Sequence, residues 1–393
     1  MLSLLLKTIF WFSAGLSLIL VTALAGRIER VGFPVSNRKD RLPCIDGLRG
    51  YLAIAVMFHH FFIWTMMVRY DVPWGKPSSY AIESLGQVSV RLFFMITGMV
   101  FYPKILEGFS NLDWKSLYYG RFFRIVPLIL LSFVMVSTII FARGGAKTNS
   151  NYLIEAISWI TGWKEVDVLG YPFSRRLNAG VLWSIWYEWL FYLFILPACA
   201  AMMQIIKKFR LPSITVPLLL FLIGAVASVL YRFYRIDVSV LRYAPLFAVG
   251  MMAYELRNHE PVRLVLSQPL MGLVALLALG ASMLMPNEGF TLALPLSGFF
   301  FVCIACGNSL WGLLVSQGAA VLGEVSFGIY VVHGIVLAIV FEEGAPLFGN
   351  LATPYVPIVM LPVSVLLVLI TCLTFLVIER PGIRLGRWLS RRA

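Results

Sequence analysis

Long apolar segments recur along this 393-residue chain, and each is close to the length that crosses a bilayer. A helix needs ~20 apolar residues to span ~30 Å of hydrocarbon. Lipid offers the backbone no water, so segments of this length must satisfy their hydrogen bonds internally as helices. The chain is 60% hydrophobic and 13% charged, whereas a soluble domain is about 25% charged. The sequence therefore predicts an all-α, polytopic transmembrane helical bundle.

Eleven apolar segments can be placed, so we expect about ten to eleven spans. Their ends are set to within about 2–4 residues. The segments lie near residues 2–25, 45–68, 86–105, 125–142, 180–203, 213–231, 241–256, 264–285, 290–308, 319–341 and 355–378. Residues 1–25 would then form an extra N-terminal span, 44–381 the main domain and 382–393 a basic cytoplasmic tail. Residues 152–162 are a candidate interfacial or re-entrant helix.

Basic residues are distributed unevenly between the two sides of this predicted bundle. The segments assigned to the cytoplasm carry 19 Lys and Arg residues, against 11 outside. This bias predicts a cytoplasmic C-terminus and an N-terminus outside. Anionic lipid headgroups account for most of the net charge of +13, and no nucleic-acid module is visible. Cys303-x-x-Cys306 has only half of a zinc-site spacing. We expect membrane lipids as partners and no metal, and the oligomeric state stays open.

Four ionisable residues lie within the predicted spans, namely His60, Arg91, Glu188 and His333. Such residues cost ~2.5–3.5 kcal/mol on insertion scales and usually mark a site or pathway. At ~1.5 Å per residue, His60 and His333 lie ~22 and ~21 Å from the cytoplasmic face. Arg91 and Glu188 lie ~8 and ~12 Å below the outer face. We therefore expect one polar site in the outer half of the bilayer, the alternative being local pairs that hold helices together.

A second polar cluster lies at the cytoplasmic ends of the predicted spans. Asp46 and Arg49 open the span that carries His60, and a spacing of eleven residues places Arg49 and His60 within ~20° on one helix face. Arg121 and Arg124 are three residues apart and therefore adjacent on a helix surface. Paired arginines suit phosphate because their planar forks make bidentate contacts. The alternative is an ordinary basic flank of a span.

Six short motifs follow one another between residues 44 and 381. They are Ile45-Asp46-Gly47-Leu48-Arg49-Gly50 with His60, Phe93-Phe94-Met95-Ile96-Thr97-Gly98, Arg121-Phe122-Phe123-Arg124-Ile125 with Pro127, Trp183-Ser184 with Glu188 and Phe191-Tyr192, Ser326-Phe327 with Tyr330 and His333, and Ile378-Glu379-Arg380-Pro381. In this order and spacing they resemble the signature of the membrane acyltransferase-3 family. Residues 44–381 are therefore expected to form an acyltransferase-3-like transmembrane domain.

The resemblance implies an enzyme, a transmembrane O-acyltransferase of a bacterial inner membrane. Members of this family take an acyl group, commonly acetyl, from cytoplasmic acyl-CoA. They transfer it to a sugar hydroxyl, so an envelope glycan, an exported glycan or a lipid-linked sugar is the expected acceptor. Acyl-CoA is then a donor substrate and a partner, and no bound cofactor is expected.

The two polar clusters fit this chemistry with distinct roles. His60 would take the proton from the attacking hydroxyl, because histidine titrates near neutral pH. Glu188 would orient His60 or receive its proton, as a carboxylate does beside imidazole in other acyl-transfer sites. Arg91 would stabilise the developing oxyanion or pair with Glu188. The residues expected to bind acyl-CoA are Arg49, Arg121 and Arg124. The expected supporting residues are Asp46, Trp183, Ser184, Tyr330 and His333.

Two other classes of protein remain open on the sequence. Intramembrane Arg, Glu and His residues also serve secondary transporters and flippases, which would here move an acylated or anionic lipid-linked substrate. Transporters often contain two-fold repeats, and none is apparent in this chain. A helical scaffold for an envelope assembly is the third possibility, with the polar residues serving only to join helices.

Overall fold

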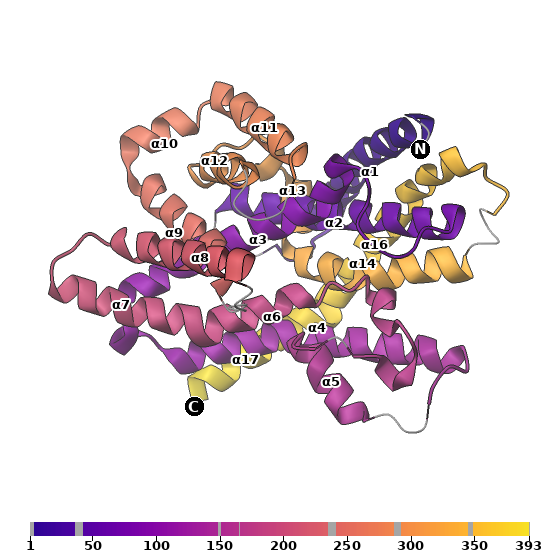
Figure 1. The fold of residues 1–393 in the computed structure, drawn as a ribbon, viewed down its shortest axis with the longest axis horizontal. Coiled ribbons are helices and arrows are strands. Elements are labelled where there is room, and N and C mark those ends of the chain that lie inside the picture. Colours follow the sequence, from indigo (N-terminus) through magenta and orange to yellow (C-terminus); the bar gives the residue numbers. More distant parts are fainter. Residues whose placement is uncertain are drawn as a thin grey trace.

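The computed structural model describes residues 4–35, 42–147, 151–164, 166–234, 241–286, 292–344 and 349–392. Within these ranges the regular structure is entirely helical, and no strand occurs. The helices pack side by side in a broad bundle, with α1 at the upper right of Figure 1 and α17 below the centre. The prediction of an all-α polytopic bundle is therefore confirmed.

Seven helical segments of the described chain are long and apolar enough to cross a membrane, and a bent pair raises the number to eight. The seven are α1 (Leu4–Arg30), α2 (Pro43–Tyr70), α3 (Tyr80–Glu107), α4 (Trp114–Ala142), the α6–α7 segment (Trp183–Lys208), the α14 segment (Ser326–Glu343) and the segment of α16 and α17 (Thr353–Arg392). They coincide with seven of the predicted spans.

The remaining predicted spans are helical too, but their helices are shorter or bent. The segments near 213–231, 241–256 and 290–308 correspond to α8 (Thr215–Tyr234), α9 (Ala244–Asn258) and α12 (Ala293–Ala305). The segment near 264–285 bends by 75° between α10 (Glu260–Leu266) and α11 (Pro269–Met283). Among the seven spans counted above, the one near 319–341 is interrupted, because α13 (Gln317–Glu324) ends before α14 begins at Ser326. A short helix, α5 (Tyr152–Thr161), occurs where one was predicted.

Three of the long segments contain a π-turn, which holds one residue more per turn than an α-helix. The π-turns lie at Phe191–Ile195 between α6 and α7, at Ile339–Glu343 after α14, and at Phe375–Glu379 between α16 and α17. Such turns break the regular register of a helix and frequently occur at functional sites. Two of them contain residues of the cavity described below, Tyr192 and Phe375.

The closest helix packing joins α3 and α9, which share the most extensive contact among the described elements. Gly98 of α3 lies against the backbone of Phe247, and Gly250 of α9 lies against the backbone of Met95. A β-carbon added at either glycine would overlap a main-chain carbonyl oxygen. The two helices therefore approach to a distance that only glycine permits, as is common where membrane helices associate. The glycine of the Thr97-Gly98 motif is thus explained by packing.

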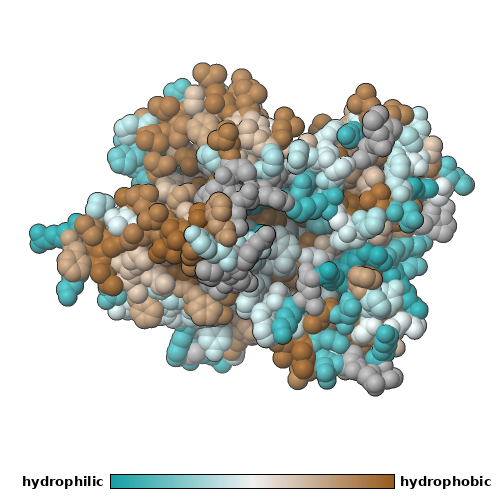
Figure 2. Space-filling model, viewed as in Figure 1, coloured by the Kyte–Doolittle hydropathy of each residue, from teal (hydrophilic) through white to brown (hydrophobic). Residues whose placement is uncertain are grey.

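Apolar side chains also cover much of the outside of the bundle. Figure 2 shows them gathered over α7, α8, α10 and α11. Leu222 and Val226 of α8 are 58% and 50% exposed, and Leu270 and Leu277 of α11 are 65% and 64% exposed. Exposed apolar area on this scale would be unfavourable in water. It suits helices whose outward faces contact lipid.

Candidate active site

A cavity of about 1440 Å³ opens at one end of the bundle. Its walls come from α2, α3, α4, α6, the start of α14 and α17. Eight basic and five acidic side chains line it, an excess of three positive charges. The basic ones are Arg49, Lys104, Arg121, Arg124, Arg257, Arg380, Arg384 and Arg387. We call this space the arginine cavity. It brings together the three arginines that the sequence assigned to acyl-CoA.

Arg121 is held by aromatic rings on the wall of the arginine cavity. Its guanidinium carbon lies 5.0 Å from the ring centre of Phe101 and 5.9 Å from that of Tyr192. The hydroxyl of Tyr192 donates a 2.7 Å hydrogen bond to Oε1 of Glu188. Stacking of this kind fixes an arginine while leaving its in-plane donors available. Glu188 thus stabilises the tyrosine against which Arg121 packs.

Arg124 belongs to a group of charged side chains on the wall of the arginine cavity. It interacts electrostatically with Arg49, Arg121 and the carboxylate of Glu379. Glu379 is only 3% exposed, and it terminates the π-turn before α17. Asp46 forms an ion pair of 3.9 Å with Arg49. A buried carboxylate among several guanidinium groups lowers their mutual repulsion. In the sequence Glu379 stands out only as part of the C-terminal motif, and no role was predicted for it.

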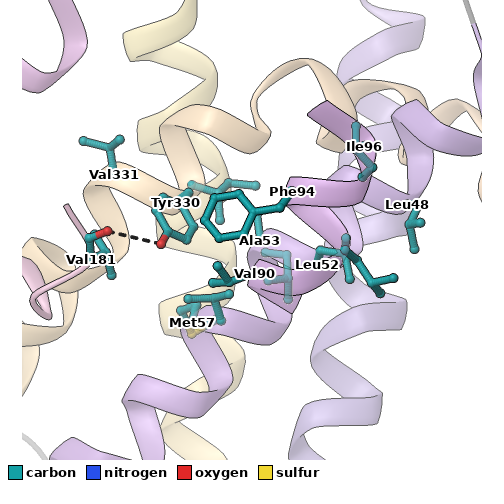
Figure 3. Close-up of a cluster of buried hydrophobic side chains, with 14 of the residues drawn as sticks. Leu48, Leu52, Ala53, Met57, Val90, Phe94, Ile96, Val181, Tyr330 and Val331 are labelled. Atoms are coloured by element: carbon teal, nitrogen blue, oxygen red, sulfur yellow. Dashed lines mark hydrogen bonds between the residues drawn. The ribbon is translucent and has the colours of Figure 1, made fainter. Parts of the chain in front are cut away.

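Two hydroxyl groups close the deep end of the arginine cavity. The hydroxyl oxygens of Ser184 and Tyr330 lie 2.8 Å apart, so that one donates to the other, and they lie 3.1 and 3.2 Å from the carbonyl oxygen of Val181, which can accept from either. Figure 3 shows Tyr330 reaching towards Val181 from among apolar side chains of α2 and α3. Both residues were predicted to support the site, and the structure places them in direct contact.

A pair of histidines lies directly beyond Tyr330. Nδ1 of His60 is 3.1 Å from Nε2 of His333, and the ring centres of Tyr330 and His333 are 6.1 Å apart. His333 is completely buried. Among the described residues, neither histidine lines the arginine cavity. The structure therefore joins His60 and His333 and separates them from the cavity by Tyr330.

The backbone assigns a protonation pattern to the histidine pair. Nδ1 of His333 lies 3.1 Å from the carbonyl oxygen of Ile329, so it must be the protonated nitrogen of a neutral ring. Nε2 of His333 then accepts, and Nδ1 of His60 donates to it and to the carbonyl of Val56 at 3.0 Å. Nε2 of His60 is left as the nitrogen with a free lone pair. A base needs such a nitrogen.

The four intramembrane residues of the sequence analysis do not form a single cluster. Glu188 lies on the wall of the arginine cavity with Tyr192, and its described hydrogen bond is to Tyr192 rather than to His60. Arg91 lies within electrostatic range of Tyr243. The ring centres of Trp183 and Tyr243 are 5.7 Å apart. Trp183 lies outside the described lining of the arginine cavity. Helical rise indicates depth but not the lateral position of a residue, which explains the difference.

Two arginines near the C-terminus also belong to the cavity and were not predicted from the sequence. Arg384 and Arg387 lie on α17 (Arg380–Arg392) and line the arginine cavity, although residues 382–393 were expected to be only a basic tail. The signal was present in the spacing, since Arg380, Arg384 and Arg387 recur at helical intervals.

This arrangement defines a class of protein, a multi-pass membrane protein with a wide basic cavity that ends beside a buried histidine pair. A family model described as an acyltransferase domain matches residues 42–377. The chain belongs to the membrane acyltransferase-3 family, as its motifs indicated, and it is a membrane acyltransferase. None of the curated proteins and none of the solved structures compared with the chain matches it.

Proposed function

We propose that this protein transfers an acyl group, most simply acetyl, from acyl-CoA to a hydroxyl of an envelope or exported glycan. One observation carries the proposal. The basic cavity ends at Ser184 and Tyr330, and the histidine pair begins one helical turn further along α14, at His333. A polyanionic donor in the cavity and a histidine base for the acceptor would thus lie on the two sides of a single layer of side chains.

The donor would lie in the arginine cavity with its thioester towards Tyr330. Arg121 and Arg124 supply donors at helical spacing for the diphosphate of CoA. Arg49, beside Arg124, would guide the acyl arm inward. Glu188 would act through Tyr192 by holding the ring on which Arg121 stacks. We propose this role in place of the one first expected of Glu188, because its carboxylate is hydrogen-bonded to Tyr192.

The acceptor hydroxyl would lose its proton to Nε2 of His60 as its oxygen attacks the thioester carbonyl carbon. The carbon–oxygen bond of the ester forms and the carbon–sulfur bond breaks. The departing CoA thiolate then takes the proton from His60, so that charge and protons balance. His333 would stabilise the imidazolium of His60 through the 3.1 Å contact. His333 is therefore a positioning residue that holds His60 in the reactive tautomer.

The same proposal gives the protein an orientation in a bacterial inner membrane. Basic residues line the arginine cavity, and such residues favour the cytoplasmic side. The C-terminal helix α17 would then lie in the cytoplasm, where acyl-CoA is available. The N-terminal end of α1 would lie on the opposite side, because its C-terminal end leads into residues 34 and 35 at the cavity.

Replacing both arginines of α4 should weaken donor binding strongly. We expect Arg121→Gln with Arg124→Gln to reduce acetyl-CoA affinity about 100-fold, since each charged hydrogen bond contributes ~1.5–3 kcal/mol. The measurement is isothermal titration calorimetry of acetyl-CoA with the full chain purified in detergent. Arg27→Gln with Arg30→Gln is the matched control. It removes two arginines at the same spacing from the last turn of α1, outside the described lining of the cavity.

Saturable binding that is lost in the α4 variant and kept in the α1 variant would support the proposal. Equal binding by both variants would remove Arg121 and Arg124 from the donor site. If folded wild-type protein does not bind acetyl-CoA, the acyl-CoA-dependent function is wrong. Movement of an intact lipid-linked substrate without thioester consumption would then identify a transporter or flippase.

A further inference from the structure

The last helix, α17, presents a row of arginines to the arginine cavity. Arg380, Arg384 and Arg387 all line it, at spacings of four and three residues that place them on one helix face. Leu385 and Trp388, on another side of the helix, are 46% and 48% exposed. The family model ends at residue 377. The row therefore belongs to the same cavity as the family's arginine pair while lying outside the matched residues.

Glycines hold α17 tightly against α4. A β-carbon on Gly382 would lie 2.7 Å from the carbonyl oxygen of Phe123, and one on Gly386 would lie 3.0 Å from that of Tyr119. As residue numbers rise along α17 they fall along α4, so the two helices are antiparallel. Gly382 and Gly386 are four residues apart, which is the small-residue pattern that allows close helix approach. The arginine row of α17 is thus fixed in position by backbone packing.

This packing places two arginine rows at the same level. Gly382 and Gly386 both contact Phe123, which lies between Arg121 and Arg124 in sequence. Arg384, midway between the two glycines, is therefore level with the arginine pair of α4. Packed helix axes are about 8–10 Å apart. One cavity thus offers two separate sets of guanidinium groups, side by side, to a single ligand.

We infer that Arg384 and Arg387 bind the 3′-phosphate of the CoA donor while Arg121 and Arg124 bind its diphosphate. The inference rests on the proposed function. Acyl-CoA carries a diphosphate and, apart from it, a 3′-phosphate monoester, and such a monoester has a charge of about −1.5 to −2 near pH 7. Arg384 and Arg387 are exposed at the open side of the cavity. The adenosine end would stay at this side while the thioester reaches Tyr330.

The test compares two donors that differ only in this phosphate. We expect wild-type protein to bind acetyl-CoA at least ~10-fold more tightly than 3′-dephospho-acetyl-CoA. Arg384→Gln with Arg387→Gln should lower acetyl-CoA affinity to that of the dephospho compound and leave the affinity for the dephospho compound unchanged. The control, Arg391→Gln with Arg392→Gln, removes equal charge from the same helix beyond the described lining and should keep the preference.

Several results would overturn the inference while leaving the proposed function intact. They are equal affinity of wild-type protein for both donors, a preference that survives in the Arg384/Arg387 variant, and an equal loss of affinity for both donors in that variant. A preference abolished by the Arg121/Arg124 variant alone would also overturn it, by placing the 3′-phosphate on α4. Binding of neither donor by wild-type protein would instead contradict the proposed function itself.

Discussion

Replacing His60 by glutamine should lower the rate of acyl transfer by about 10²–10⁴-fold, equivalent to roughly 3–5 kcal/mol of activation free energy. Glutamine fills a similar volume but cannot accept and return a proton. The proposed donor site lies on the other side of Tyr330, so acetyl-CoA affinity should stay within about two-fold of the wild-type value. The measurement is transfer of labelled acetyl groups from acetyl-CoA to the glycan fraction of membranes that contain the protein.

The neighbouring histidine provides a matched control for this prediction. His59 lies next to His60 on α2, but its Nδ1 is hydrogen-bonded to the carbonyl oxygen of Ile82 at 2.9 Å. It points to α3 rather than to His333. His59→Gln should therefore retain most of the transfer activity. Full activity in His60→Gln, or an equal loss in the two variants, would remove His60 from the role of base.

Alanine at Gly98 should destabilise the fold by about 3 kcal/mol or more, a large effect for a single methyl group. Overpacking usually costs ~1–3 kcal/mol when side chains can move aside. Here the added carbon meets the main-chain carbonyl of Phe247, which cannot move without separating α9 from α3. Gly250→Ala, which adds a methyl group against the carbonyl of Met95, should have a similar effect. The measurement is the thermal unfolding midpoint in detergent, together with the yield of monodisperse protein.

Gly280 of α11 is the control for the glycine variants, since nothing lies within 4 Å of a β-carbon built there. Gly280→Ala should change stability by less than about 0.5 kcal/mol, or raise it slightly because alanine favours the helix. A folded and equally stable Gly98→Ala protein would show that α3 and α9 do not depend on their close backbone approach.

Much of the fold could be predicted because apolar length alone determines where a chain crosses a bilayer. The interruptions were harder to predict. The segment near 319–341 reads as continuous, but α13 ends at Glu324 and α14 begins at Ser326. Gly323, Glu324 and Ser326 surround this break. Such residues also occur within continuous membrane helices, because neighbouring helices can supply hydrogen-bond partners, so they do not mark a break by themselves. Hydropathy averages over such a break. Hydropathy likewise does not reveal the 75° bend before Pro269.

The candidate site was predicted in its residues more than in its arrangement. His60 and His333 were assigned similar depths, and they are in contact. Glu188 was assigned a depth close to theirs, yet it is hydrogen-bonded to Tyr192 on another wall. Depth follows from helical rise, but lateral position depends on which helices are neighbours. The place of Arg384 in the cavity likewise depends on the contact of α17 with α4, which only the three-dimensional structure contains.

Buried apolar side chains form a layer around Tyr330, and this layer bears on how well the membrane retains its ion gradients. An ion gradient stored across a bilayer is dissipated by any continuous file of water. A cavity of about 1440 Å³ lined by charges admits water deep into this bundle. The buried side chains packed around Tyr330 interrupt that path, and Figure 3 shows Leu52, Ala53, Met57, Val90 and Phe94 among them. We therefore expect the layer that separates the cavity from the histidines to act as electrical insulation and to limit the passage of ions through the bundle.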